Sequence, residues 1–380
     1  MRKESVRYIL RNPNNELKKL LIEDSPRSIF LVTGEKSYEK SGAKKFIDNL
    51  LNGFTVVRFS DFADNPKIED VNKGINIFLE NSCDYLIAIG GGSVMDMAKL
   101  INIGYDKNNI EDLTTKKAEI SSPGKKLITI PTTSGSGSEA THFAVVYVGG
   151  EKFSVAHPIY MLPNVVVLNP SLTYSMNSYQ TALSGVDAFA QAMESYWSIN
   201  STEESKKYSI EALKLIIEHL PLAVNYNDNS RDIMLHAANL AGKAINIAKT
   251  SGAHAISYVL TSKFNIPHGQ AVALTLPSWY DFNHNCNENN INDARGLTYI
   301  KNVMKDIKNV INDFETNSGK GSMRIRRFIE SIGLETSLSA FEVHPSDLDY
   351  IVGKINLERL NNNPTKASLA ELSRILKETF

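Results

Sequence analysis

The stretch of sequence that decides the fold is DYLIAIGGGSVMDMAKL, residues 84–100. It begins with a mostly apolar segment of strand length, continues with three glycines, and ends in residues that favour a helix. The sequence therefore predicts a buried strand over 84–89 and a helix from Val94 to about Ile103. A strand followed by a glycine turn and a helix is the repeating unit of a parallel sheet.

The same alternation extends on both sides of this stretch. Apolar runs at 28–33, 55–59, 127–130, 143–147 and 165–168 are predicted strands, with helices predicted through Leu51 and over 66–80. Beyond Thr181 the pattern changes to successive helices, for example over 202–220, 229–246 and 300–314. A chain of 380 residues exceeds what one hydrophobic core usually serves. We therefore predict an α/β domain with a parallel sheet covered on both faces over residues 1–175, and an all-α domain over 176–380.

Composition and charge exclude several classes of function. The net charge of −1 provides no electrostatic footprint for nucleic acid or for an anionic membrane. Only two cysteines are present, Cys83 and Cys286, which argues against a disulfide scaffold. No apolar run approaches membrane-spanning length, and the N-terminus lacks the apolar core of a signal peptide. We expect a cytoplasmic protein whose partners are small molecules.

The glycine cluster is the first candidate binding site. Gly90, Gly91, Gly92 and Ser93 lie between a predicted strand and a predicted helix, and Asp96 and Lys99 follow in that helix. Glycines there let backbone N–H groups approach a pyrophosphate, and the helix N-terminus favours negative charge. The alternative is that the glycines form only a tight turn.

A second candidate binding loop is PTTSGSGSE at 131–139, which directly follows a predicted strand. Its hydroxyl-bearing residues include Thr132, Thr133, Ser136 and Ser138. A flexible linker has a similar composition, but linkers do not usually start at a buried strand and return into another one. We interpret the segment as a binding loop for the same ligand.

Four residues in the second half of the chain are candidate metal ligands. Asp187 and Gln191 are four residues apart in a segment of good helix formers, so both side chains leave one face of a helix. His254 and His268 lie on either side of an apolar patch. Two imidazoles and one carboxylate suit Zn²⁺ or Fe²⁺, with the Gln191 amide as a weak fourth donor. The alternative is a solvated helix face and two packed histidines.

Together these motifs resemble those of the iron-containing (group III) alcohol dehydrogenase family. The matching motifs are GGGSxxDxxK at 90–99, PTTSGSGSE at 131–139, Asp187, His254 and PHG at 267–269. The resemblance covers nearly the whole chain and implies a dehydroquinate synthase-like fold, with a dinucleotide-binding α/β domain and a helical metal-binding domain. It also implies a dimer or larger assembly. In such an enzyme a metal ion polarises the substrate carbonyl and a nicotinamide cofactor transfers a hydride.

Two departures from the family pattern concern the metal and the proton. Gln191 stands where the family usually has a histidine, so the resemblance implies three protein ligands, Asp187, His254 and His268, and leaves Fe²⁺ and Zn²⁺ as alternatives. Tyr258 stands where the family commonly has another histidine, which is thought to relay the alcohol proton. Tyr258 is therefore a candidate catalytic residue, with the alternative that it fills the pocket wall.

A third departure concerns the cofactor. Gly34 ends the first predicted strand, where NAD-preferring family members often have an aspartate that binds the ribose. Loss of this carboxylate removes repulsion against a 2′-phosphate, and Lys36, Lys40 and Lys44 are near in sequence. We expect NADP, or use of both NADP and NAD, with the alternative that Gly34 is only a tight turn and the lysines form a solvated face.

The substrate prediction rests on similarity to the phosphonoacetaldehyde reductase branch of the family, through residues 191–202 and 244–254 and the pairing of Gln191 with Tyr258. Asn246, Lys249, Thr250 and Ser251 are the predicted substrate contacts, together with Tyr258, and Lys249 is also a candidate catalytic residue. The alternative is that Lys249 caps a helix. We expect reduction of phosphonoacetaldehyde to 2-hydroxyethylphosphonate.

Other functions remain open from the sequence. Two alternatives share the dehydrogenase chemistry: a general short-chain primary alcohol dehydrogenase and a three-ligand zinc polyol dehydrogenase. A metal-dependent cyclase of a sugar phosphate is a third. A non-catalytic NAD-binding protein is a fourth, if Gln191 abolishes metal binding.

Overall fold

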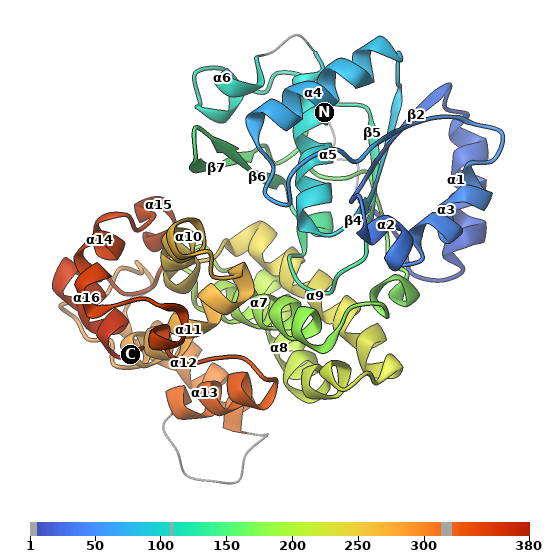
Figure 1. Ribbon diagram of the computed structural model, residues 1–380. Helices are drawn as coiled ribbons and strands as arrows, with labels where there is room; N and C mark the ends of the chain where they lie inside the picture. The colour runs from blue at the N-terminus through green and yellow to red at the C-terminus, as the bar shows by residue number, and fades with distance from the viewer. Residues whose placement is uncertain (1–5, 107–108, 313–320) are drawn as a thin grey trace. The chain divides into compact units, whose positions relative to one another are not determined.

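The computed structural model describes residues 6–106, 109–312 and 321–380. The chain divides into two compact units, Met1–Met176 and Asn177–Phe380, one residue from the boundary expected from the sequence (Figure 1). The last two residues of the helix predicted over 300–314 lie outside the described residues. Each unit has its own core, and each is described by itself below.

A six-stranded parallel sheet forms the centre of the N-terminal unit, in the order β1-β8-β5-β4-β2-β3. This confirms the predicted fold class, including the strand that leads into the glycines. In the register of the sheet, Gly90 at the end of β4 pairs with Pro131 at the end of β5. Both predicted binding loops therefore leave the sheet at its carboxyl edge. The strands are β1 (Arg7–Ile9), β2 (Ser28–Thr33), β3 (Thr55–Phe59), β4 (Tyr85–Gly90), β5 (Lys126–Pro131) and β8 (Val165–Val167).

Helices cover the sheet on both faces because successive side chains of each buried strand point in opposite directions. In β2, Ile29 and Leu31 pack in a cluster with residues of α1 and α3, whereas Phe30 and Val32 pack with residues of α4 and α5. Helices α1 and α3 lie on one face of the sheet, and α4 and α5 lie on the other (Figure 1). The helices of this unit are α1 (Pro13–Asp24), α2 (Ser37–Lys40), α3 (Ala43–Leu51), α4 (Ile68–Glu80), α5 (Gly92–Gly104) and α6 (Ile110–Thr114), with short 3₁₀ turns η1 (Ser138–Ala140) and η2 (Pro170–Thr173).

The strand predicted over 143–147 is present but does not join the parallel sheet. It forms β6 (Phe143–Val148), which pairs antiparallel with β7 (Glu151–Ala156) in a separate hairpin. Gly149 and Gly150 make the turn with φ of 57° and 85°, a conformation that glycine adopts without strain. The hairpin keeps the 131–139 loop folded back toward α5, since the Val145 N–H donates to Asp96 over 2.9 Å.

The C-terminal unit is entirely helical among its described residues, as predicted. No helix in the described part of the chain combines the length and the apolar character needed to span a membrane. The helices are α7 (Ser178–Trp197), α8 (Glu203–Val224), α9 (Asp228–Ala248), α10 (Gly252–Phe264), α11 (His268–His284), α12 (Leu297–Asn312), α13 (Gly321–Ser331), α14 (Leu348–Gly353), α15 (Leu357–Leu360) and α16 (Leu369–Lys377), with 3₁₀ turns η3 (Leu338–Phe341) and η4 (Pro345–Asp347).

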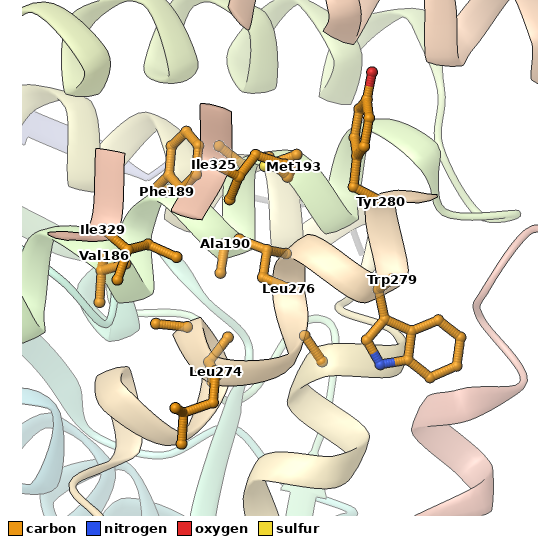
Figure 2. Close-up of a cluster of buried hydrophobic side chains, with 14 of the residues drawn as sticks. Val186, Phe189, Ala190, Met193, Leu274, Leu276, Trp279, Tyr280, Ile325 and Ile329 are labelled. Carbon is orange, nitrogen blue, oxygen red and sulfur yellow. The ribbon is translucent and has the colours of Figure 1, made fainter. Parts of the chain in front are cut away.

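Helix α7 lies at the centre of this unit and is buried on almost every side from Ala188 to Trp197. Its apolar residues pack against α11 and α13 (Figure 2). A helix with no solvated face must place its polar side chains against protein partners. In α7 these polar side chains include Asp187, Gln191 and Glu194. The labelled members of the cluster are Val186, Phe189, Ala190, Met193, Leu274, Leu276, Trp279, Tyr280, Ile325 and Ile329.

Candidate metal centre and cofactor loops

Three buried polar side chains share one face of α7, namely Asp187, Gln191 and Glu194. They are separated by four and three residues, so they lie one above the other along the helix. The Gln191 Nε2 group donates to Asp187 Oδ2 over 3.0 Å, which holds the carboxylate in place. The same-face arrangement of Asp187 and Gln191 follows the expectation from the sequence.

The two predicted histidine ligands come from neighbouring helices. His254 lies in the first turn of α10, and His268 is the first residue of α11. Their Nε2 atoms lie 3.2 Å and 3.8 Å from Asp187 Oδ1. One ligand atom from each of the three residues falls within 4.8 Å of the others. The three predicted ligands are therefore brought together in one small cluster.

Two glycines allow the helices to approach closely enough to form this cluster. A Cβ atom on Gly269 would lie 2.1 Å from the Leu183 carbonyl oxygen of α7. A Cβ atom on Gly252 would lie 2.3 Å from the Trp279 ring of α11. Because the first contact is with backbone, any side chain at 269 forces α11 away from α7 and moves His268 with it.

Glu194 is a site residue that the sequence reasoning missed. Its carboxylate is fully buried and accepts hydrogen bonds from the His254 Nδ1 group, from the Ala253 N–H over 2.7 Å and from the Ser251 hydroxyl over 3.2 Å. A carboxylate on Nδ1 leaves Nε2 to face Asp187 and raises the basicity of the imidazole. The available signal was its position seven residues after Asp187, on the same helix face.

The carboxylates also set the protonation of the cluster. Burial disfavours a charged imidazole, but Glu194 and Asp187 outweigh it and raise the pKa of His254 to about 9. Burial likewise disfavours the Asp187 carboxylate, yet its bonds with His254 and its proximity to His268 lower the pKa of Asp187. A divalent cation that binds there displaces the His254 proton, because a ligating imidazole is neutral.

The donor set fits a divalent metal ion. One carboxylate oxygen and two imidazole nitrogens are the usual protein ligands of a catalytic Zn²⁺ site and are equally suitable for Fe²⁺. Asp187, His254 and His268 would hold the ion. The Gln191 amide nitrogen donates to Asp187 Oδ2, and its Oε1 atom is a buried oxygen. Direct ligation by Gln191 stays a prediction.

The predicted substrate residues occupy the junction between α9 and α10. Asn246 is half-buried in the last turn of α9, and Lys249 is exposed at its C-terminal cap. The Thr250 and Ser251 side chains are buried, and the Ser251 hydroxyl accepts from Trp197 Nε1 over 2.9 Å while it donates to Glu194. Ser251 thus supports the His254 environment, and a contact with substrate stays a prediction.

Tyr258 follows His254 by four residues on α10 and is half-buried. Its hydroxyl accepts a hydrogen bond from Arg359 Nε over 3.1 Å, and Arg359 Nη1 also donates to Thr250 Oγ1 over 2.8 Å. Arg359 is a functional candidate that only the tertiary structure reveals. No local pattern marks it, because its partners lie about one hundred residues earlier in the chain.

In the N-terminal unit, the two predicted cofactor loops are in contact. Thr132 N–H donates to Gly90 O over 2.9 Å. A Cβ atom on Gly92 would lie 2.8 Å from the Ser136 hydroxyl, and one on Gly91 would lie 3.5 Å from Thr133. A side chain at 92 would therefore displace the Ser136 side chain where the two loops meet. Ser93 is half-buried beside them at the start of α5, and its hydroxyl donates to the Asp64 carbonyl.

Asp96 and Lys99 of α5 hold the 131–139 loop in place through hydrogen bonds. The buried Lys99 ammonium donates to the Ser138 carbonyl over 2.6 Å and to Thr141 Oγ1 over 3.0 Å, and Asp96 accepts from the Ser138 hydroxyl over 2.6 Å. Burial lowers the pKa of Lys99 to about 8 against the opposing charges of Asp96 and Glu139. These side chains position the loop, and their direct contact with a cofactor stays a prediction.

Gly34 follows β2 at the carboxyl edge of the sheet, and a Cβ atom there would lie 2.2 Å from the Ser37 hydroxyl. Arg58 of β3 lies beside it, since its Nε group donates to Thr33 Oγ1 over 2.9 Å and its Nη2 group to the Gly34 carbonyl over 3.4 Å. The Arg58 guanidinium also covers the Tyr38 ring at 4.6 Å. The sequence analysis considered only lysines here and missed this arginine.

Comparison with known proteins agrees with both halves of this description. Residues 8–170 match the family model of iron-containing alcohol dehydrogenase, and residues 181–380 match that of the C-terminal part of the Fe-containing alcohol dehydrogenase family. The "Probable alcohol dehydrogenase EutG" of Escherichia coli is 34% identical over 67% of this chain and 66% of that enzyme, just under two thirds of its length.

Two further relatives act on aldehydes that carry an acidic group. The phosphonoacetaldehyde reductase of Streptomyces viridochromogenes is 30% identical over 78% of this chain and 76% of that enzyme. The crystal structure of sulfoacetaldehyde reductase from Bifidobacterium kashiwanohense in complex with NAD⁺ matches with a TM-score of 0.87 at 25% identity, covering 99% of this chain and 97% of that one.

Proposed function

Because the chain belongs to the iron-containing alcohol dehydrogenase family, we propose that it is a metal-dependent, nicotinamide-dependent aldehyde reductase and alcohol dehydrogenase. The observation that carries this proposal is the cluster of the buried Asp187 and His254 with the half-buried His268, and with Glu194 on the far side of His254. A carboxylate on Nδ1 fixes the imidazole tautomer and leaves Nε2 available to a metal ion.

The protein residues have separate tasks in this reaction. A divalent ion bound by Asp187, His254 and His268 supplies Lewis acidity to the substrate carbonyl oxygen, and NAD(P)H supplies the hydride. Gln191 holds Asp187, and Glu194 orients His254. Tyr258 accepts from Arg359, an arrangement that favours donation of its own hydroxyl proton to the developing alkoxide.

We propose an aldehyde with an anionic end, phosphonoacetaldehyde, as the substrate. Lys249 precedes Thr250 in the chain, and Arg359 donates to the Thr250 hydroxyl, just before the first turn of α10 that carries His254. Arginine and lysine are the residues that recognise phosphonate and phosphate oxygens. The similarity to a phosphonoacetaldehyde reductase supports the same choice.

The substrate class is tested by the reduction rates of phosphonoacetaldehyde and butanal with metal-reconstituted protein. We expect kcat/KM for phosphonoacetaldehyde to exceed that for butanal by about 100-fold, which corresponds to about 3 kcal/mol of transition-state discrimination. Equal or faster reduction of butanal contradicts the anionic substrate and leaves a general short-chain alcohol dehydrogenase of the same family.

We further propose that the cofactor is NADPH. Gly34 offers no carboxylate to repel a 2′-phosphate, and Arg58 lies against its carbonyl oxygen at the same strand end. An arginine next to this position is the usual means of binding the 2′-phosphate in a dinucleotide fold. The missing carboxylate at Gly34 and the cation at Arg58 act on the 2′-phosphate, which is the group that distinguishes NADPH from NADH. They therefore affect the choice of cofactor and leave the hydride transfer unchanged.

Replacement of Arg58 by methionine is expected to raise KM for NADPH by about 10-fold or more and to leave KM for NADH within a factor of about two, because only NADPH loses a charged contact. The matched control is Arg27→Met, since Arg27 is an exposed arginine that bonds Asp84 just before the opposite end of β2. An equal effect of Arg58→Met on both cofactors contradicts the assignment.

A further inference from the structure

The backbone between α9 and α10 is held in a conformation that is unfavourable for its residues. Lys249 has φ 62° and ψ 175°, a region that is essentially restricted to glycine. Such a conformation costs of order 1–3 kcal/mol and persists only where the surroundings impose it. The strained backbone at Lys249 therefore marks the junction between α9 and α10 as a place where neighbouring segments impose the conformation.

Hydrogen bonds from two other segments impose this conformation. The Ser198 hydroxyl donates to the Ala248 carbonyl over 2.6 Å, and Asn362 Nδ2 donates to the Thr250 carbonyl over 2.9 Å. Trp197 Nε1 donates to the Ser251 hydroxyl on the next residue. The carbonyls and hydroxyl on both sides of Lys249 are therefore fixed by side chains from the end of α7 and from the segment after α15.

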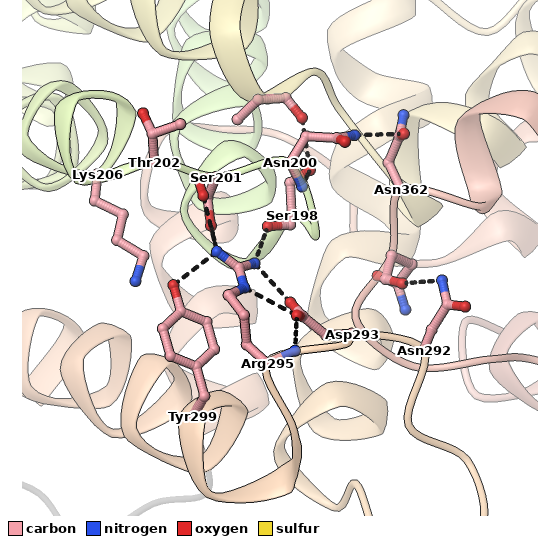
Figure 3. A network of polar contacts seen from close by, with 12 residues as sticks. Ser198, Asn200, Ser201, Thr202, Lys206, Asn292, Asp293, Arg295, Tyr299 and Asn362 are labelled. Atoms are coloured by element: carbon pink, nitrogen blue, oxygen red, sulfur yellow. Dashed lines mark hydrogen bonds and ion pairs between the residues drawn. The ribbon is translucent and has the colours of Figure 1, made fainter.

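A second layer of contacts fixes those side chains in turn (Figure 3). Arg295 donates to the carbonyls of Ser198 and Ser201 over 2.9 Å and 2.8 Å and forms an ion pair with Asp293 at 2.6 Å. Asn200 Nδ2 donates to Asn362 Oδ1 over 2.9 Å, which joins the two segments. The junction is thus a rigid platform, as expected for a binding site that must be formed before its ligand arrives.

Arg359 adds a half-buried guanidinium to this platform. It bridges two elements, because Nη1 donates to Thr250 at the junction and Nε donates to Tyr258 of α10. Tyr258 lies one helical turn from His254, which is about 6 Å along the helix axis. Through its bond to the Tyr258 hydroxyl, the Arg359 guanidinium is therefore fixed to the helix that carries His254, one turn further along it.

We propose that Arg359 is the specificity-determining residue that recognises the phosphonate group of the substrate, with Lys249 as a second cation. The inference rests on the proposed function and deepens it. Arg359 is suited to this role because a planar guanidinium held by two hydrogen bonds is pre-organised, whereas the exposed Lys249 ammonium is a mobile point charge. The same bond to Tyr258 links recognition of the anion to the position of the proposed proton donor.

The experiment compares Arg359→Met and Arg359→Lys with wild-type metal-reconstituted protein. We expect Arg359→Met to raise KM for phosphonoacetaldehyde by about 100-fold and Arg359→Lys by about 10-fold, with KM for butanal changed by less than about threefold. Binding of methylphosphonate, followed by calorimetry without turnover, is expected to weaken in the same order.

The matched control is Arg326→Met. Arg326 is also a half-buried arginine of this unit and donates two hydrogen bonds, to the carbonyls of Thr336 and Glu378. The Arg326→Met variant is expected to leave the ratio of KM for phosphonoacetaldehyde to KM for butanal unchanged. Thermal melting of each variant shows whether it folds, and where Arg359→Met does not fold, Arg359→Lys decides.

The outcomes separate this inference from the proposed function. In the first outcome, wild-type protein prefers phosphonoacetaldehyde while the Arg359 variants change KM for both aldehydes equally or for neither. In that case Arg359 is only a structural bridge, and the inference is overturned while the proposed function stands. If wild-type protein shows no preference and methylphosphonate binding does not depend on Arg359, both are overturned. Selective loss of phosphonoacetaldehyde and methylphosphonate binding supports both.

Discussion

Replacement of His268 by alanine is expected to remove the bound metal and the activity together. His268 Nε2 is one of three donor atoms in the cluster, and its loss leaves only Asp187 and His254. Two protein ligands hold a divalent ion too weakly to survive dialysis, and the Lewis acid that polarises the carbonyl is worth several kcal/mol. We expect kcat/KM to fall by about 1,000-fold or more.

The control for this prediction is His284→Ala on the same helix. His284 is the last residue of α11, is exposed and stacks on the Tyr280 ring at 5.8 Å. The substitution therefore removes an imidazole from the same helix but leaves Asp187, His254 and His268 in place. Metal content by elemental analysis and kcat/KM are measured on the same preparations. Retention of a full equivalent of metal by the His268 variant excludes the proposed ligand set.

Replacement of Glu194 by glutamine is expected to weaken metal binding by about 10- to 100-fold, with the fold retained. The amide keeps the shape of the carboxylate and still accepts from the Ala253 N–H, but it removes the negative charge beside His254 Nδ1. A less basic imidazole binds a cation less tightly. Metal affinity is measured by competition with a chelator, and the secondary structure by circular dichroism.

Replacement of Glu194 by alanine has a larger consequence for the metal-free protein. It leaves the Ser251 hydroxyl, the Ala253 N–H and the His254 ring without their buried acceptor. We expect the free energy of unfolding to drop by about 3–5 kcal/mol. Glu211→Gln, an exposed change on α8, serves as the control. If Glu194→Gln binds metal as tightly as wild-type protein, Glu194 does not orient the ligand.

The sequence by itself predicted the fold class and the three residues, Asp187, His254 and His268, that the structure brings together in one cluster. Short apolar runs alternating with helical ones require a parallel sheet, because only burial on both faces accommodates such strands. The spacing of Asp187 and Gln191 fixed their common face, because helical geometry is local. The glycines at 90–92 likewise marked a close approach, which the structure shows with the hydroxyl loop at Ser136.

Only the tertiary structure decided which side chains support these groups. Glu194 reaches His254 across 60 residues of sequence, and Arg359 reaches Thr250 across 109. Arg58 meets Gly34 because β2 and β3 are adjacent strands. A hydrogen bond between distant segments depends on how helices and strands pack, and packing is set by the whole core at once. No local pattern in the sequence encodes such a contact. For this reason the members of the cluster could be named from the sequence, whereas the side chains that support them could not.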